Sequence, residues 1–298
     1  MSAFIDLQVN GAGGFDLTTE PESLWRVGEV LPRYGVAAFL PTLVSPSFVI
    51  VDRARTAWAA GAPAGYAGAT PLGWHVEGPF ISPKRAGVHD LASLQAPNAG
   101  AVADWSPASG VRMVTLAPEL PGALEVVATL IANGVVVSAG HSAATHEEAV
   151  AGFDAGIRCV THLFNAMPPL DHRHPGLVGA ALADERVTIA LIPDGLHVHP
   201  AMVALARRAV GPDRLAIVTD AVAGFGMPPG TYVLAGRECI VDGVSARLPD
   251  GALAGSVLAM DQAVRNLAAY AGIPEADAAL AATTVPARLL GLAEKPGR

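Results

Sequence analysis

Acidic and imidazole side chains follow apolar runs at widely separated places in this sequence. Glu77 follows WHV, His141 follows VVSAG, His162 lies within RCVTHL and Asp220 within AIVTDA. One carboxylate and two neutral imidazoles suit a divalent ion such as Zn²⁺, with a fourth position open for water. A metal ion there lowers the pKa of water to about 7, and Asp220 is available to carry the proton. The set predicts metal-assisted hydrolysis of a carbonyl or related centre.

The stretch FIDLQVNGAGG near the N-terminus bears on the number of metal ions. Gln8 and Asn10 are separated by one residue in an apolar run, so in a strand both side chains point to the same side. Carboxamides are poor ligands for Zn-type ions, and the pair therefore predicts one metal ion per chain. We expect Gln8 and Asn10 to hydrogen-bond the metal ligands or the reactive water. Zn²⁺ is the expected ion, with Fe²⁺, Co²⁺ and Mn²⁺ as alternatives.

The elements that must position these residues are eight apolar runs of strand type, separated by helical segments. The runs cover 4–10, 36–44, 71–78, 111–118, 135–141, 158–165, 187–194 and 215–221. Alternating strands and helices predict parallel pairing, and eight such units in 298 residues predict a (β/α)8 barrel of the TIM type. In a barrel the C-terminal strand ends share one rim, where the polar residues would meet. A doubly wound open sheet is the alternative architecture.

Helix signals lie between the strands, and the pattern changes after the eighth one. Thr19–Glu22 and Thr145–Glu148 have the form of capping boxes, with Gly35 and Gly156 as expected stops, and Pro121 and Pro200 precede two further helices. Two Asp-Gly dipeptides in an alternating segment predict a β-hairpin insertion at about 231–250, followed by a helical C-terminal tail. No linker divides the chain, so we expect one catalytic domain over 1–298.

Composition excludes several classes of partner. The formal net charge is −8, which argues against nucleic-acid or anionic-membrane binding. The N-terminus has no basic segment before its apolar run, so no signal peptide is expected. The two cysteines, Cys159 and Cys239, have no metal-type spacing and are expected to be buried thiols. We expect a cytoplasmic protein.

Several histidines have a plain structural interpretation. A lone histidine at a strand end is more often a hydrogen-bonded core or loop residue than a ligand. We keep that interpretation for His75 and His146, and we expect His172, His174 and His199 to lie in solvated loops.

The motifs together resemble the N-acetylglucosamine-6-phosphate deacetylase family of the amidohydrolase superfamily. They run in order through nearly the whole chain: FIDLQVNGAGG, WHVEGPFISPKRAGVHD, SAGHSAATHEEA, THLFNAMPPLDHRHPGLVGA, DGLHVHP, VTDA and LAGSVLAM. The resemblance implies a distorted (β/α)8 barrel and removal of the acetyl group from N-acetylglucosamine 6-phosphate in amino-sugar catabolism. By motif, Glu77, His141 and His162 would be the metal ligands and Asp220 the acid/base. His89 in GVHD would contact the substrate and polarise its amide carbonyl.

The resemblance also implies a binding site for an amino-sugar phosphate. Arg173 and His197 would contact the phosphate, which needs such donors in an acidic protein. Since part of this site can come from a neighbouring subunit in the family, a homodimer is implied. The expected substrate-binding residues are Val88, His89, Asn165, Ala166, Arg173, Asp194, Gly195, Leu196, His197, Leu253, Ala254 and Gly255.

One departure from the family and two rival functions accompany this interpretation. Family members normally carry a small β-sandwich domain, which we expect to be largely missing because the chain starts almost at the first strand and ends at GLAEKPGR. The first rival is another amidohydrolase that deacylates a different amide or opens a cyclic amide. The second is an inactive, truncated sugar-phosphate-binding remnant.

Overall fold

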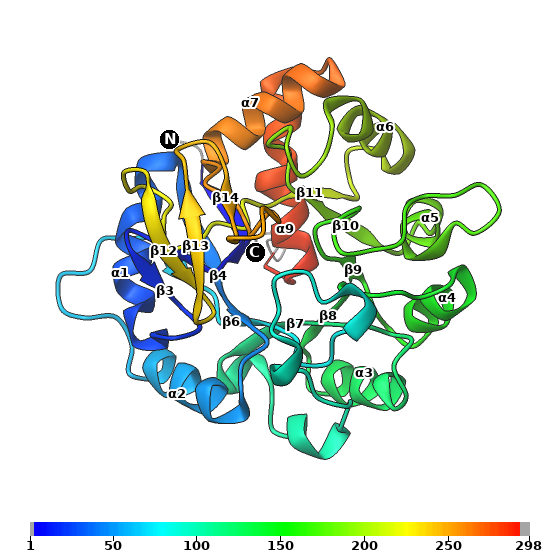
Figure 1. The fold of residues 1–298 in the computed structure, drawn as a ribbon, viewed down its shortest axis with the longest axis horizontal. Coiled ribbons are helices and arrows are strands. Elements are labelled where there is room, and N and C mark those ends of the chain that lie inside the picture. Colours follow the sequence, from blue (N-terminus) through cyan, green and yellow to red (C-terminus); the bar gives the residue numbers. More distant parts are fainter. Residues whose placement is uncertain (1–2, 293–298) are drawn as a thin grey trace, which may run out of the picture.

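Eight runs of buried apolar residues form the parallel strands at the centre of the structure, which is a computed structural model describing residues 3–292 (Figure 1). The strands are β1 (Phe4–Val9), β4 (Val36–Val44), β6 (Trp74–Glu77), β7 (Val111–Leu116), β8 (Val136–Ala139), β9 (Cys159–Val160), β10 (Thr188–Leu191) and β11 (Leu215–Ile217). Their order across the sheet follows their order in the chain, from β1 to β11. In a doubly wound sheet the order of the strands would reverse at a point within the sheet. The predicted (β/α)8 barrel is therefore confirmed.

Helices surround this barrel on its outside (Figure 1). Most strands are followed by a helix that runs back to the start of the next strand, as in other α/β barrels. The described helices are α1 (Leu24–Val30), α2 (Phe48–Ala59), α3 (Ala123–Ala132), α4 (His146–Asp154), α5 (Gly176–Ala183), α6 (Pro200–Val210), α7 (Met260–Ala271), α8 (Glu275–Ala279) and α9 (Thr284–Leu289). The segment after β6 begins with short 3-10 turns, and its residues Gly87 and Val88 line the cavity beside Glu77.

One of the two predicted capping boxes is present and the other is not. The Thr145 side chain accepts from the Glu148 N–H, and Glu148 accepts from the Thr145 N–H at the start of α4. The box predicted at Thr19–Glu22 is wrong, because Thr19 donates to Asp16 through its N–H (2.8 Å) and its hydroxyl (2.9 Å). Glu22 instead forms an ion pair with Arg53 of α2.

The barrel closes where β1 and the residues after it meet the segment after β11, and a buried carboxylate takes part in the closure. Asp220 N–H donates to Gln8 O (3.0 Å), and Val9 forms an isolated bridge with Ala221. Below these contacts, Asp6 accepts from the Thr219 hydroxyl (2.5 Å) and from the Thr219 N–H (3.3 Å). Asp6 thus links the first strand to the segment that carries Asp220.

A second, smaller sheet lies beside the barrel mouth. It contains β12 (Gly230–Leu234), β13 (Arg237–Val241) and β14 (Ala246–Arg247), joined in antiparallel fashion. Its buried side chains form a separate cluster with the last residue of β4 and with residues after β11: Val44, Val222, Leu234, Cys239, Val241, Ala246, Leu248 and Ala254. Three short strands complete the description: β2 (Gly11–Ala12), β3 (Phe15–Asp16) and β5 (Thr70–Pro71). Residues 293–298, most of the GLAEKPGR end, lie outside the described part.

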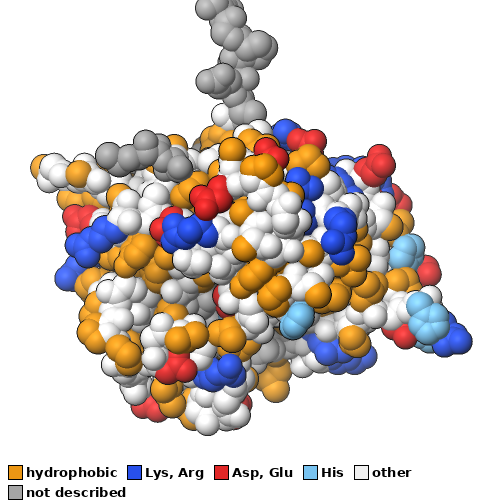
Figure 2. Space-filling model, turned by 90° about the horizontal axis from the view of Figure 1, so that it is seen from above, with side chains coloured by type: hydrophobic (Ala, Val, Ile, Leu, Met, Phe, Trp, Pro, Cys, Tyr) orange, Lys and Arg blue, Asp and Glu red, His pale blue; other side chains and the backbone are white. Residues whose placement is uncertain are grey.

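The surface carries charges of both signs. On the face seen in Figure 2, Lys and Arg side chains are interspersed with Asp and Glu, and apolar side chains lie between them. Among the described residues, no helix has both the length and the apolar character needed to cross a bilayer.

The Asp6 carboxylate predicts a pH-dependent component of stability. Burial raises the pKa of Asp6 from its ordinary value of 3.8 to about 7, against the opposing hydrogen bond from Thr219. Between these values the folded state holds one more proton than the unfolded state. The unfolding free energy therefore falls as pH rises from 4 to 7, by at most about 1.4 kcal/mol per pH unit.

Urea denaturation of Asp6→Asn between pH 4 and 7 should show a shallower fall than the wild type, since asparagine cannot ionise. The matched control is Asp213→Asn, which removes an exposed carboxylate paired with Arg288. An Asp6→Asn profile parallel to the wild type would contradict this assignment.

Candidate active site

The polar residues predicted at strand ends do converge on one rim of the barrel. Glu77 is the last residue of β6, and His141 and His162 each lie two residues beyond the ends of β8 and β9. Asp220 follows β11. His141, His162 and Asp220 have positive φ angles of 46°, 29° and 54°. Such backbone conformations are unfavourable for non-glycine residues and are concentrated at functional sites.

Glu77, His141 and His162 bring three potential ligand atoms together. Glu77 Oε1 lies 3.1 Å from His162 Nε2 and 3.3 Å from His141 Nε2, and the two Nε2 atoms are 3.0 Å apart. Ligands about 2.0–2.1 Å from a tetrahedral Zn²⁺ lie roughly 3.3–3.4 Å from one another. The spacing and the donor types therefore fit a single divalent ion.

The hydrogen bonds of the ring nitrogens support the same fit. His141 Nδ1 lies 3.0 Å from the carbonyl oxygen of Arg85, which can only accept, so Nδ1 carries the hydrogen. The Nε2 lone pair of His141 then faces the cluster, as metal ligation requires. Within the described residues, Asn10 Oδ1 is a buried polar atom without a partner, as expected beside a site that another group completes.

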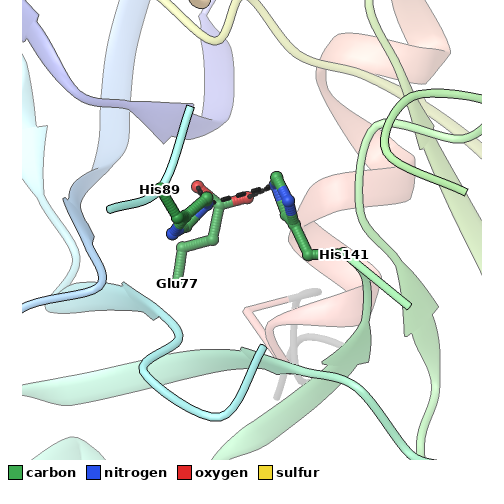
Figure 3. A group of neighbouring side chains, drawn as sticks. All are labelled: Glu77, His89 and His141. Atoms are coloured by element: carbon green, nitrogen blue, oxygen red, sulfur yellow. Dashed lines mark hydrogen bonds and ion pairs between the residues drawn. The ribbon is translucent and has the colours of Figure 1, made fainter. Parts of the chain in front are cut away.

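His89 was predicted to contact the substrate, and in the structure its ring also lies directly against the ligand cluster. Its Nε2 is 3.2 Å from His141 Nε2 and 3.8 Å from Glu77 Oε2. Figure 3 shows the two imidazoles directed at the Glu77 carboxylate. Glu77, His89 and His141 are therefore a second group that could hold a metal ion. The sequence motif did not reveal this proximity, which depends on the fold of the loop after β6.

The electrostatics of the cluster favour an ionised Glu77. Burial opposes its ionisation, but hydrogen bonds from His141 and His162 outweigh burial and hold its pKa well below the usual range. Burial also opposes ionisation of His162, and the Glu77 hydrogen bond overcomes it and raises the His162 pKa. Burial lowers the pKa of His89 well below its ordinary value, with His141 acting in the same direction.

The pKa of Asp220 is shifted in the opposite direction from the pKa of Glu77. Burial and the nearby charge of Glu77 raise its pKa to about 6. Its Oδ1 accepts from Asn10 Nδ2 at 2.6 Å, while Gln8 Nε2 donates to Glu77 Oε1 at 3.2 Å. The two carboxamides thus each contact one acid of the site. A carboxylate with a pKa near neutrality can take up and release a proton at physiological pH.

A cavity of about 170 Å³ adjoins these residues, and half of the predicted substrate-binding residues line it. The predicted residues that line it are Val88, Asn165, Ala166, His197, Leu253 and Gly255. Its remaining apolar wall comes from residues that sequence reasoning missed: Val44, Ile192 and Leu234. These are ordinary apolar residues at or near strand ends, and nothing in their local sequence distinguishes them from core residues.

The other predicted substrate residues do not line this cavity. His89 borders a neighbouring cavity with Lys84, Arg85 and Arg237. Asp194 instead orders its own loop, since it accepts from the Leu196 and His197 N–H groups and pairs with His197 Nδ1 at 2.6 Å. The remaining residues are Arg173 and Leu196, which are exposed, Gly195, which is half-buried, and Ala254, which is buried under the small sheet.

The histidines given a structural interpretation do not belong to the ligand cluster. His75 is buried, with Nε2 2.7 Å from Thr115 Oγ1 and Nδ1 3.1 Å from Leu7 O. His199 caps the start of α6 by accepting from the Ala201 N–H. His146 lies in the first turn of α4, and His172 and His174 are exposed in a loop.

Comparison with known proteins identifies close relatives. The sequence model of the Amidohydrolase family matches residues 1–298. The chain is 38% identical to N-acetylgalactosamine-6-phosphate deacetylase of Escherichia coli O157:H7, over 99% of this chain and 80% of that protein. It is 37% identical to human N-acetylglucosamine-6-phosphate deacetylase, over 99% of this chain and 75% of that protein.

Solved structures give the same result. An N-acetyl-D-glucosamine-6-phosphate deacetylase variant from Mycobacterium smegmatis, in complex with N-acetyl-D-glucosamine-6-phosphate, superposes with a TM-score of 0.90 at 37% identity. The match covers 98% of this chain and 77% of that one. The corresponding enzyme from Thermotoga maritima has a TM-score of 0.89 at 32% identity, over 98% and 79% of the two chains.

Metal analysis of two variants should separate the two possible ligand groups. We expect about one metal ion per wild-type chain, near zero in His162→Ala, and about one in His89→Ala, if Glu77, His141 and His162 are the ligands. The measurement is elemental analysis after removal of loosely bound ions. Retention in His162→Ala together with loss in His89→Ala would assign the site to the other group, and two ions per wild-type chain would contradict the role given to Gln8 and Asn10.

Proposed function

The chain belongs to the amidohydrolase family, and we propose that it hydrolyses the acetamide of N-acetyl-D-glucosamine 6-phosphate to D-glucosamine 6-phosphate and acetate. The observation that carries this proposal is the convergence of four polar residues beside a cavity: Glu77, His141, His162 and Asp220. Relatives of the chain are named N-acetylglucosamine-6-phosphate deacetylase. The reaction belongs to amino-sugar catabolism.

We propose Glu77, His141 and His162 as the residues that hold one divalent ion, with Zn²⁺ favoured by the mixed carboxylate and imidazole donors. When bound, the ion would acidify water and polarise the acetyl carbonyl. His89 donates a hydrogen bond to the carbonyl oxygen, on which negative charge develops. Gln8 holds the Glu77 carboxylate in place through its 3.2 Å hydrogen bond.

Asp220 carries the proton in this mechanism. The Asn10 hydrogen bond fixes the orientation of its carboxylate, and in its ionised form the group is able to accept a proton. It takes a proton from the attacking water as the carbon–oxygen bond forms. It then gives that proton to the amide nitrogen as the carbon–nitrogen bond breaks. The products are acetic acid and the free amine, which become acetate and the ammonium form when the acid's proton passes to the amine, and Asp220 returns to its ionised form.

The substrate's sugar and phosphate are assigned to the residues around the cavity. Asn165 and Ala166 line it and would bind the sugar phosphate, with His197 beside them. Arg173 is exposed and does not line the cavity of its own chain. We therefore propose that it reaches the phosphate of a neighbouring copy in a homodimer.

Burial of the free thiols Cys159 and Cys239 is compatible with the reducing cytoplasm, where we place the protein.

A second candidate substrate is the C4 epimer, N-acetyl-D-galactosamine 6-phosphate. It is favoured by the Escherichia coli O157:H7 relative, which is 38% identical and carries that substrate in its name. The chemistry at the acetamide is the same for both sugars. The two differ only in the direction of one hydroxyl group.

Substrate assays with the metal-loaded protein test the proposal directly. We expect acetate release from N-acetyl-D-glucosamine 6-phosphate, with a lower kcat/KM for the galactosamine epimer. N-acetyl-D-glucosamine without phosphate should react at least about 100-fold less efficiently, because a site built for a charged group leaves its donors unpaired. No release from either phosphorylated sugar would exclude the proposal and favour the inactive remnant. Equal rates without phosphate would favour another deacylase.

Asp220→Asn should abolish turnover while the metal is retained. The amide cannot accept the proton, so we expect kcat to fall by at least about 100-fold. Elemental analysis should still give about one metal ion per chain, as in the wild type. Asp213→Asn, an exposed carboxylate paired with Arg288, is the matched control and should keep its activity. Near-normal turnover of Asp220→Asn would remove Asp220 from the mechanism.

A further inference from the structure

His89 has two possible roles that depend on the position of one hydrogen. If its Nε2 has a lone pair, His89 is able to ligate the metal ion with Glu77 and His141. If Nε2 carries the hydrogen, His89 donates to the substrate instead. The other ring nitrogen, Nδ1, decides between these forms through the hydrogen bond that it makes.

That partner is the hydroxyl group of Ser45. Ser45 Oγ lies 2.6 Å from His89 Nδ1, and both side chains are buried. Ser45 has a positive φ of 38°, and its N–H donates to Glu77 O at 2.7 Å. Gly78 leaves room for the hydroxyl, because a Cβ there would lie 2.7 Å from Ser45 Oγ. The backbone thus holds Ser45 between His89 and the strand of Glu77.

The Ser45 hydroxyl hydrogen has one acceptor within reach. In the described part of the chain, His89 Nδ1 is the only hydrogen-bond partner of Ser45 Oγ. A buried hydroxyl hydrogen without an acceptor is costly, whereas an oxygen lone pair is left unused at lower cost. Ser45 therefore donates, Nδ1 accepts, and the hydrogen of neutral His89 is on Nε2.

The contact with His141 is compatible with this form. His141 carries its hydrogen on Nδ1, which donates to Arg85 O, and presents a lone pair at Nε2. His89 Nε2 lies 3.2 Å from that lone pair. A hydrogen on His89 Nε2 makes this contact a hydrogen bond in the metal-free protein.

We propose that Ser45 is a positioning residue that fixes the Nε2–H form of His89, which makes His89 a hydrogen-bond donor and not a metal ligand. The identity of the acceptor, the acetyl carbonyl oxygen, rests on the proposed function. The tautomer itself does not depend on the substrate.

Nitrogen NMR of the metal-free protein with ¹⁵N-labelled histidine measures the tautomer directly. The His89 signals are assigned by their loss in His89→Gln. We expect an unprotonated Nδ1 and a protonated Nε2 in the wild type. Ser45→Ala and Ser45→Gly should both shift His89 toward the Nδ1–H form. Ser45→Gly removes the hydroxyl while relieving the positive φ, so it tests the proposal even if the alanine variant folds poorly.

The matched control is Ser47→Ala, which removes an exposed hydroxyl at the start of α2 and should leave the His89 tautomer unchanged. In the metal-loaded protein both Ser45 variants should lose about 10- to 100-fold in kcat with a nearly unchanged KM and about one metal ion per chain. A protonated Nδ1 in the wild type, or an unchanged tautomer in Ser45→Gly, would overturn the proposal. A wild type with the expected tautomer but without deacetylase activity would contradict the proposed function alone.

Discussion

The buried carboxylate of Glu77 is the group on which the rest of the site depends. Its oxygens contact Gln8, His141 and His162, and its main-chain oxygen accepts from Ser45. A buried charge is tolerated only when it is paired and hydrogen-bonded. The surrounding donors therefore both stabilise the ionised form of Glu77 and fix the directions of the ligand atoms. Stability and ligand geometry arise from the same contacts.

The closure of the barrel has a similar double role. β1 carries Gln8 and is followed by Asn10, and Asp220 follows β11, so the two acids of the site are aligned only if the first and last strands meet at the correct height. Main-chain hydrogen bonds cross this junction, and the Asp6 carboxylate adds bonds to Thr219 between its two sides. The ends of the sheet, which are far apart in sequence, thereby set the distance between Asn10 and Asp220.

Sequence reasoning succeeded where periodicity and barrel geometry determine the outcome. The strand runs place Glu77, His141, His162 and Asp220 on one rim, because parallel strands share their C-terminal end. It failed where irregular loops decide. The approach of His89 to the cluster depends on the loop after β6. Thr19 donates to Asp16 in a local turn and so does not form the predicted capping box. In the sequence, Asp6 only interrupts an apolar run. Its hydrogen bond with Thr219 joins residues far apart in the chain and could not be predicted from local sequence.

The small sheet has a consequence for how this site is built. Leu234 at the end of β12, together with Leu253 and Gly255 beyond β14, forms part of the cavity wall, while the metal ligands and Asp220 all precede that segment in the chain. Part of the cavity wall is thus encoded in one stretch of the chain that contains none of the reacting groups. The same stretch also reaches the loop that carries His89, because Arg237 of β13 donates to Val88 O at 2.9 Å, so the small sheet joins a wall of the cavity to the loop beside the ligand cluster.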